Sequence, residues 1–216
     1  MKTDINPQLV AYIEEEILPQ YLAFDAAHQP NHALTVIEES MKLAEHYPVD
    51  QSMVYAIAAF HDTGLRKDRA THHLVSGEII RTTQRLHDFF TADEIEMMAQ
   101  AAEDHRASID HEPRSIYGKI VAEADRCIDS HTIVKRTIQY GLSHYPNLDK
   151  EGHYARFIQH MKEKYAEGGY LKIWLEESAN AIRLKRFQET LKDEKETRRL
   201  FLDGWDEIKS EQHKDA

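Results

Sequence analysis

Residues 49–64 read VDQSMVYAIAAFHDTG, and this stretch decides how the rest of the chain is interpreted. Its first twelve residues are almost wholly apolar, which is typical of a buried helix, and Gly64 supplies a stop for that helix. Adjacent side chains cannot share one face of a regular helix, but at a fraying helix end they can converge. We therefore expect His61 and Asp62 to emerge together from the end of a buried helix.

The flanking sequence predicts an all-α protein. Only 8 Gly and 6 Pro interrupt the chain, apolar residues recur at three- and four-residue spacing, and sustained two-residue alternation is absent. Thr91 and Glu94 are placed to form a capping box at the start of a helix. We expect helices at about 9–17 (ending near Pro19), 32–47, 49–60, 72–89, 92–105, 116–128, 133–142 and 152–165, and one or two helices over 176–208 after a hinge at Gly168-Gly169.

Composition limits the class of protein. With 216 residues and a mean hydropathy of −0.64, the chain can bury one sizeable core, so we expect a single domain. The formal charge of −11 excludes a general attraction to nucleic acid or to an anionic membrane. No apolar run is as long as a bilayer span, the first residues do not resemble a secretion signal, and Cys127 is the single cysteine. These features predict a cytoplasmic protein.

Two further residues join the His-Asp pair as candidate metal ligands. His32 lies in the first turn of an expected helix, and Asp125 lies on the helix marked by apolar residues over 116–128. A divalent ion that activates water needs neutral imidazoles and carboxylates that converge from different elements and leave one coordination position open. His32, His61, Asp62 and Asp125 supply two of each.

This pattern resembles the HD superfamily of metal-dependent phosphohydrolases. A lone histidine is followed about thirty residues later by His-Asp at the end of an apolar helix, and then by a downstream aspartate on a helix. The segments 59–64, 72–80 and 104–106 also resemble the extended HD pattern, in which two further histidines follow the pair. The resemblance covers about residues 25–130.

The resemblance implies an HD-domain-like helical bundle with additional C-terminal helices, as one domain over 1–216 with a metal-binding core at about 25–130 and an extension over 131–216. It implies that His32, His61, Asp62 and Asp125 hold a metal. In members with two ions, Asp62 would bridge them, and His72 and His105 would ligate the second. The alignment favours His72 over His73, although a shift by one residue remains an alternative. The cofactor would be one or two divalent ions of Mn, Co, Mg, Ni, Fe or Zn.

The implied reaction is hydrolysis of a phosphate ester by a metal-activated water. The expected substrate is a nucleotide or a related small phosphorylated metabolite, and phosphomonoesterase, phosphodiesterase and nucleotidase activities remain open. Arg106 and Lys67, with Arg66 as an alternative to Lys67, are candidates for donating to the phosphate oxygens. Asp68 is a candidate for orienting the attacking water or protonating the leaving group.

Two other functions remain open. The same ligand set could hold two irons in an HD-type diiron oxygenase, or the domain could be a non-catalytic, metal-binding module that senses a nucleotide. Arg106-Ala107-Ser108 stands where cyclic-dinucleotide phosphodiesterases carry Gly-Tyr-Pro, so that activity is not implied. We expect no membrane partner and no extended nucleic-acid surface. The C-terminal helices could form a homodimer or pack back onto the core.

Overall fold

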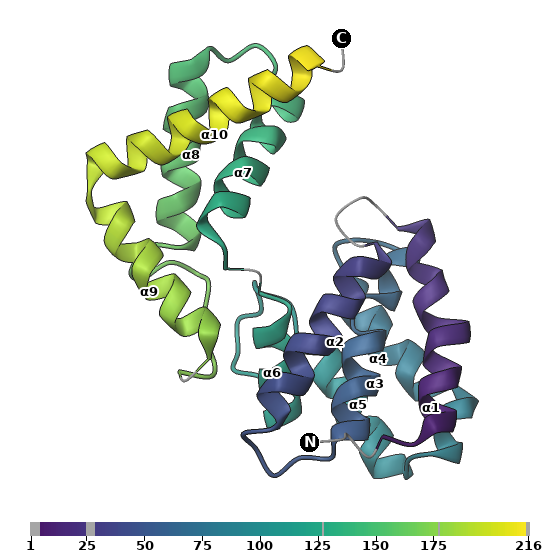
Figure 1. Ribbon diagram of the computed structural model, residues 1–216. Coiled ribbons are helices and arrows are strands. Elements are labelled where there is room, and N and C mark those ends of the chain that lie inside the picture. The colour runs from purple at the N-terminus through teal and green to yellow at the C-terminus, as the bar shows by residue number, and fades with distance from the viewer. Residues whose placement is uncertain (1–4, 25–28, 127, 177, 215–216) are drawn as a thin grey trace. The chain divides into compact units, whose positions relative to one another are not determined.

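The computed structural model describes residues 5–24, 29–126, 128–176 and 178–214, so Cys127 lies outside the described residues. Within these ranges the regular elements are all helices and no strand is formed, which confirms the all-α prediction. The chain divides into two compact units, Met1–Arg126 and Cys127–Ala216, seen in Figure 1 as the purple-to-teal and green-to-yellow parts. The prediction that they form a single domain stays a prediction.

The first unit is a bundle built around one apolar helix, α3. All of the residues 53–60 on α3 are buried, and the helix packs against α2, α5, α6 and the segment η1. The elements of this unit are α1 (Pro7–Tyr12), the π-helical η1 (Ile13–Ile17), the 3-10 helix η2 (Leu18–Ala23), α2 (Pro30–Ala44), α3 (Gln51–Phe60), the 3-10 helix η3 (Thr63–Arg66), α4 (His72–Thr82), the 3-10 helix η4 (Gln84–Asp88), α5 (Ala92–Glu103) and α6 (Ile116–Ala124).

Short polar side chains fix where the helices that carry the site begin. Asp50 caps α3 by accepting hydrogen bonds from the amides of Ser52 and Met53. Thr91 and Glu94 form the predicted capping box at the start of α5, each accepting from the other's backbone amide. Such caps satisfy amides that would otherwise lack a partner in the first helical turn.

The structure corrects three predicted helix limits. The first helical region continues past Pro19 to Ala23, because a proline near the start of the 3-10 segment η2 loses no intrahelical hydrogen bond. The expected helix over 72–89 is split at Thr83, whose backbone is extended, into α4 and η4. Helix α6 ends at Ala124, so Asp125 is its C-terminal cap rather than a residue within it.

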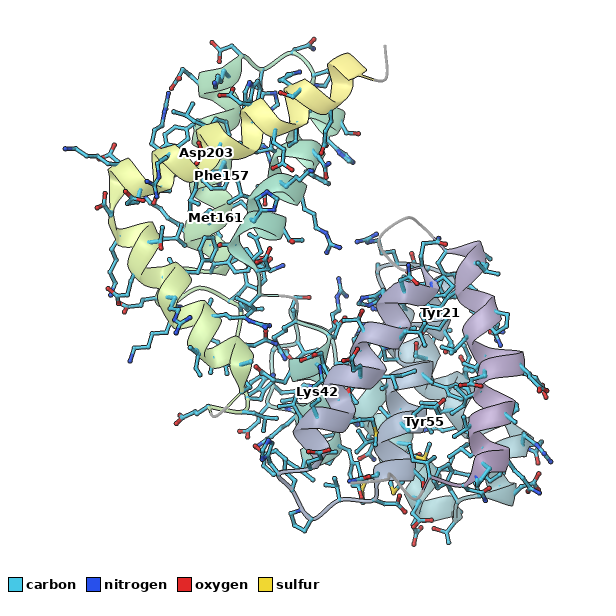
Figure 2. All side chains as sticks on the ribbon, viewed as in Figure 1. Tyr21, Lys42, Tyr55, Phe157, Met161 and Asp203 are labelled. Carbon is cyan, nitrogen blue, oxygen red and sulfur yellow. The ribbon has the colours of Figure 1, made fainter. Side chains whose placement is uncertain are left out.

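The second unit has its own buried interior. It contains α7 (Ser130–His144), α8 (Lys150–Lys164), α9 (Ala179–Lys192) and α10 (Glu194–Lys214), so the region over 176–208 forms two helices. Helix α10 packs against α7, α8 and α9, and Phe157 and Met161 of α8 are fully buried (Figure 2). Gly168, in the predicted hinge, has a φ of 81°, which explains a glycine at this turn. In the described ranges, no helix combines the length and the hydrophobicity needed to cross a bilayer.

Candidate metal centre

The ends of five helices bring the predicted metal ligands of the first unit together. His32 lies in the first turn of α2, and His61 and Asp62 follow the last residue of α3. His72 begins α4, His105 lies two residues after the last residue of α5, and Asp125 comes directly after α6. Beyond the end of a helix, adjacent side chains are not forced onto different faces. The adjacent His61 and Asp62 can therefore both point towards one centre.

The first group of ligand atoms surrounds one oxygen of Asp62. The Nε2 atoms of His61 and His32 lie 3.2 Å and 3.5 Å from Asp62 Oδ2, and the three ligand atoms lie within 4.8 Å of one another. Asp125 adds a second carboxylate, with its Oδ1 3.2 Å from His32 Nε2 and 3.8 Å from His61 Nε2. These four residues supply two imidazole nitrogens and two carboxylates.

The second group surrounds the other oxygen of the same carboxylate. Asp62 Oδ1 lies 3.3 Å from His72 Nε2 and 3.4 Å from His105 Nε2. These three residues also meet the distance criterion of a metal-binding group. Asp62 therefore presents one oxygen to each pair of histidines.

Three of the histidines are held in one tautomer by the same local device. The Nδ1 atoms of His61, His72 and His105 donate to carbonyl oxygens three residues earlier, those of Ala58, Arg69 and Ala102, at 2.7, 2.8 and 2.5 Å. A carbonyl oxygen can only accept, so each neutral ring keeps its lone pair on Nε2. All three lone pairs belong to the atoms that face Asp62.

The spacing of these nitrogens tests whether the donor set fits a cation. The Nε2 atoms of His72 and His105 lie 3.3 Å apart, as do those of His32 and His61. When neutral, His72 and His105 place two nitrogen lone pairs at this distance, and these repel unless a cation lies between them. The donor set of imidazole nitrogens and carboxylate oxygens is also one that divalent metals accept. The residues present therefore fit divalent metal binding.

Electrostatics keeps both carboxylates ionised. Burial raises the pKa of Asp62, but the imidazoles of His61, His105 and His32, when protonated in the metal-free site, outweigh burial and hold that pKa well below its usual range. Burial likewise raises the pKa of Asp125, while His32, His61 and His105 lower it to about 2 overall. Both groups are therefore negative at neutral pH and available to a cation.

Exposure to solvent differs among the ligand side chains. The side chains of His61, His105 and Asp62 are only 0%, 2% and 4% exposed, whereas those of His32 and Asp125 are 25% and 24% exposed. Among these five ligands, His32 and Asp125 are therefore the most accessible to solvent.

Tyr21 hydrogen-bonds to the backbone amide of Asp62, and this contact was not predicted from the sequence. Its buried hydroxyl donates to the carbonyl of Ala59 at 2.9 Å and accepts from the amide of Asp62 at 3.3 Å. Burial and the charge of Asp62 raise the pKa of Tyr21 well above its ordinary value, so the hydroxyl stays protonated. The first helix was predicted to end near Pro19, so no sequence pattern singled out Tyr21.

Gly64 lets the segment after Asp62 approach α4. Its amide donates to Ser76 Oγ at 2.9 Å, and a Cβ at this position would lie 2.0 Å from the carbonyl oxygen of His72. Gly64 does not have a positive φ, so close approach, rather than a left-handed stop, accounts for it. This contact brings His72 towards Asp62. The adjacent His73 is not part of either metal-binding group of the described residues.

The three predicted catalytic side chains belong to the loop between η3 and α4 or contact it. Lys67 Nζ lies 3.7 Å from a carboxylate oxygen of Glu78, and Asp68 Oδ2 accepts from the amide and the hydroxyl of Thr71. Arg106 donates to the carbonyl of Ala70 at 2.6 Å. These contacts order the loop that precedes His72, and the catalytic roles stay predictions.

Comparison with known proteins agrees with this geometry. The family model described as HD domain matches residues 31–128. The matched segment begins one residue before His32 and ends three residues after Asp125, so it spans all six side chains of the centre. No curated protein and no solved structure matches the chain.

Proposed function

We propose that this protein is a metal-dependent phosphohydrolase, because the HD domain family model matches residues 31–128. Its proposed substrate is a phosphate ester of a nucleotide or a related small metabolite. The observation that carries the proposal is the division of the Asp62 carboxylate, with Oδ2 facing His32 and His61 and Oδ1 facing His72 and His105. A carboxylate placed in this way can bridge two ions.

Each of the two proposed ions has its own set of ligands. His32, His61, Asp62 and Asp125 would hold one ion, and His72, His105 and Asp62 would hold a second. A bound divalent ion would lower the pKa of its water towards neutrality and polarise a phosphoryl oxygen. The carbonyl partners of His61, His72 and His105 bind Nδ1, so Nε2 of each neutral ring would carry the lone pair that ligates an ion.

Cationic side chains near the centre suit a phosphate. The chain as a whole has a formal charge of −11, so its overall field opposes a polyanionic substrate. Arg66 and Arg69 flank the loop after Asp62, and Arg106 follows His105 directly. Charged donors of this kind bind phosphate oxygens with two parallel hydrogen bonds. The local positive charge favours phosphate chemistry over the diiron oxygenase alternative.

The test combines metal analysis with activity. Protein purified without chelator is analysed for bound metal and incubated with generic phosphoesters and a nucleotide panel under added Mn²⁺, Co²⁺, Mg²⁺ and Ni²⁺. We expect stoichiometric metal and hydrolysis in the wild type, and loss of both in an Asp62→Ala variant. An Asp110→Ala variant, which removes an exposed carboxylate of the same unit, should behave as the wild type.

Other outcomes would support the alternatives. Bound iron with oxygen consumption and without phosphoester hydrolysis would favour the oxygenase, because six imidazole and carboxylate ligands also suit two irons. Tight nucleotide binding without turnover would favour a sensing module. A folded protein that binds no metal when supplied with it would contradict the metal centre itself.

A further inference from the structure

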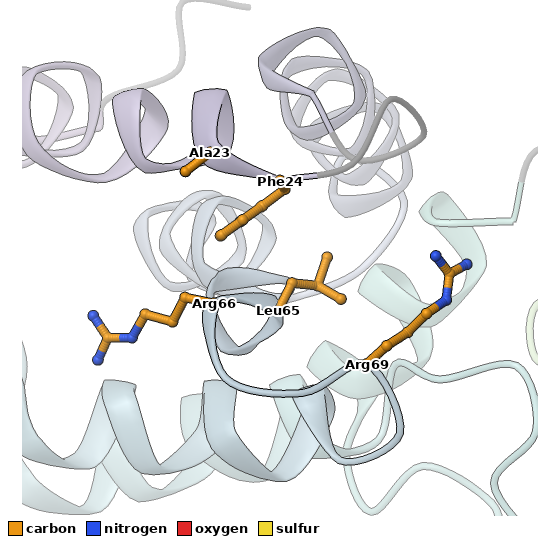
Figure 3. A pocket seen from close by; sticks show the side chains of 5 residues that line it. All are labelled: Ala23, Phe24, Leu65, Arg66 and Arg69. Atoms are coloured by element: carbon orange, nitrogen blue, oxygen red, sulfur yellow. The ribbon is translucent and has the colours of Figure 1, made fainter.

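One pocket of the first unit is lined by none of the six proposed metal ligands. It has a volume of about 360 Å³ and is lined by Ala23 and Phe24, at the end of η2, and by Leu65, Arg66 and Arg69 from the segment after Asp62 (Figure 3). This volume falls within the range of roughly 300–1,000 Å³ that is typical of small-molecule sites. The pocket can therefore hold part of a metabolite-sized ligand.

Backbone hydrogen bonds connect the pocket walls to the metal ligands. The amide of Leu65 donates to the carbonyl of Asp62 at 3.0 Å, and the carbonyl of Arg69 accepts from His72 Nδ1 at 2.8 Å. The ring of Phe24 lies 5.1 Å from that of Tyr21, whose hydroxyl accepts from the Asp62 amide. A ligand in the pocket would thus lie beside residues that position both histidine groups.

The chemistry of the lining combines an apolar surface with two positive charges. Phe24 and Leu65 form the middle of the pocket in Figure 3, and Arg66 and Arg69 extend from the loop in opposite directions. Phe24 is half-buried, and both arginines are exposed. An aromatic face and a leucine bind a flat ring, and guanidinium groups bind phosphate oxygens or stack on such a ring.

We infer that Phe24, Leu65, Arg66 and Arg69 form a subsite for the part of a ligand that is not attached to the metals, namely a planar ring with an additional anionic group. The link between this subsite and hydrolysis rests on the proposed function. A substrate held here would direct its scissile phosphoryl group to the metals and leave its ring and its second anionic group in the pocket. Binding to the subsite can be measured without turnover.

The test uses three probes with the full-length, metal-supplied protein. Adenosine diphosphate offers a ring and a phosphate chain, adenosine offers the ring alone, and inorganic phosphate reports on the metals alone. Isothermal titration calorimetry gives the Kd of each probe for the wild type and for Arg66→Gln, Arg69→Gln and Phe24→Ala variants. Arg85→Gln is the matched control, since Arg85 is an exposed arginine of the same unit that pairs with Asp88.

Each variant has its own expected pattern. Arg66→Gln and Arg69→Gln should each weaken adenosine diphosphate binding by about tenfold or more, because charge-assisted hydrogen bonds are lost, and should leave adenosine and phosphate unchanged. Phe24→Ala should weaken adenosine diphosphate and adenosine by a similar factor, because the stacking surface is removed, and leave phosphate unchanged. Arg85→Gln should change none of the three values.

Two results would overturn the inference. One is an adenosine diphosphate affinity that is the same in the three pocket variants as in the Arg85→Gln control. The other is an equal loss in Arg66→Gln, Arg69→Gln and Arg85→Gln with no loss in Phe24→Ala, which would indicate general charge attraction only. If the protein hydrolyses a generic phosphoester but the Kd of adenosine diphosphate is unchanged in the pocket variants, the subsite is rejected and the hydrolase proposal stands. If the pocket variants weaken adenosine diphosphate binding but the protein hydrolyses no phosphoester, the subsite stands and the hydrolase proposal is rejected.

Discussion

The position of Asp62 depends on Tyr21 as well as on the histidines that face its carboxylate. A Tyr21→Phe variant removes the hydroxyl that pairs with the Asp62 amide and the Ala59 carbonyl in the buried interior. We expect a loss of about 1–3 kcal/mol in the free energy of unfolding and a metal affinity about tenfold to a hundredfold weaker. Urea unfolding and competitive metal titration measure the two effects. Tyr55→Phe on α3, labelled with Tyr21 in Figure 2, is the control, and equal effects in both variants would contradict the role of Tyr21.

His32 makes the metal-free protein sensitive to pH. Burial lowers its pKa, but hydrogen bonds to Asp125 and Asp62 outweigh burial and raise it from 6.5 to about 9. The folded state therefore binds this proton more tightly than the unfolded state. The stabilisation is fully present below about pH 6.5 and is lost as the pH rises to about 9.

We expect the Tm of chelator-treated protein to fall across this window, and His32→Gln to reduce that fall. Parallel Tm profiles for the two proteins would contradict this assignment.

At the scale of helices, Gly64 controls how closely η3 approaches α4. A Cβ in a Gly64→Ala variant would meet the backbone of His72 and Ser76, which cannot swing away as a side chain can. We expect a loss of about 1–3 kcal/mol in the free energy of unfolding, since overpacking has this cost, and displacement of His72 from Asp62. Elemental analysis should then show that the second ion is lost before the first. A Gly152→Ala variant on α8 is the control, and full metal content in Gly64→Ala would contradict the prediction.

The helices could be predicted where local chemistry decides them. The apolar run over 53–60 and the capping pair Thr91 and Glu94 each act within a few residues, so α3 and α5 follow from the sequence. The split at Thr83 could not be predicted, because apolar spacing continues across it. The same holds at the site: the His-Asp pair has a recognisable local pattern, whereas Tyr21 reaches it only through a contact that is distant in sequence.

At the scale of the whole molecule, the proposed ligands all belong to one unit. The buried hydrophobic cluster around α3 runs from Leu9 to Ala124, and the six ligand side chains lie between His32 and Asp125, so both precede the boundary at Arg126. We therefore expect a fragment of residues 1–126 to fold cooperatively and to bind as much metal per chain as the full-length protein.

The gain in stability on adding metal measures whether the fragment of residues 1–126 binds the ion as the full-length protein does. An ion that binds only the folded state stabilises it by about 2.7 kcal/mol at a hundredfold excess over its Kd, so the fragment and the full chain should gain the same increment in urea unfolding. A matched fragment with Asp62→Ala should gain none, because its central carboxylate is missing. A fragment that fails to fold, or that folds without binding metal, would show that residues 127–216 are needed to complete the metal-binding fold, as the single-domain prediction requires.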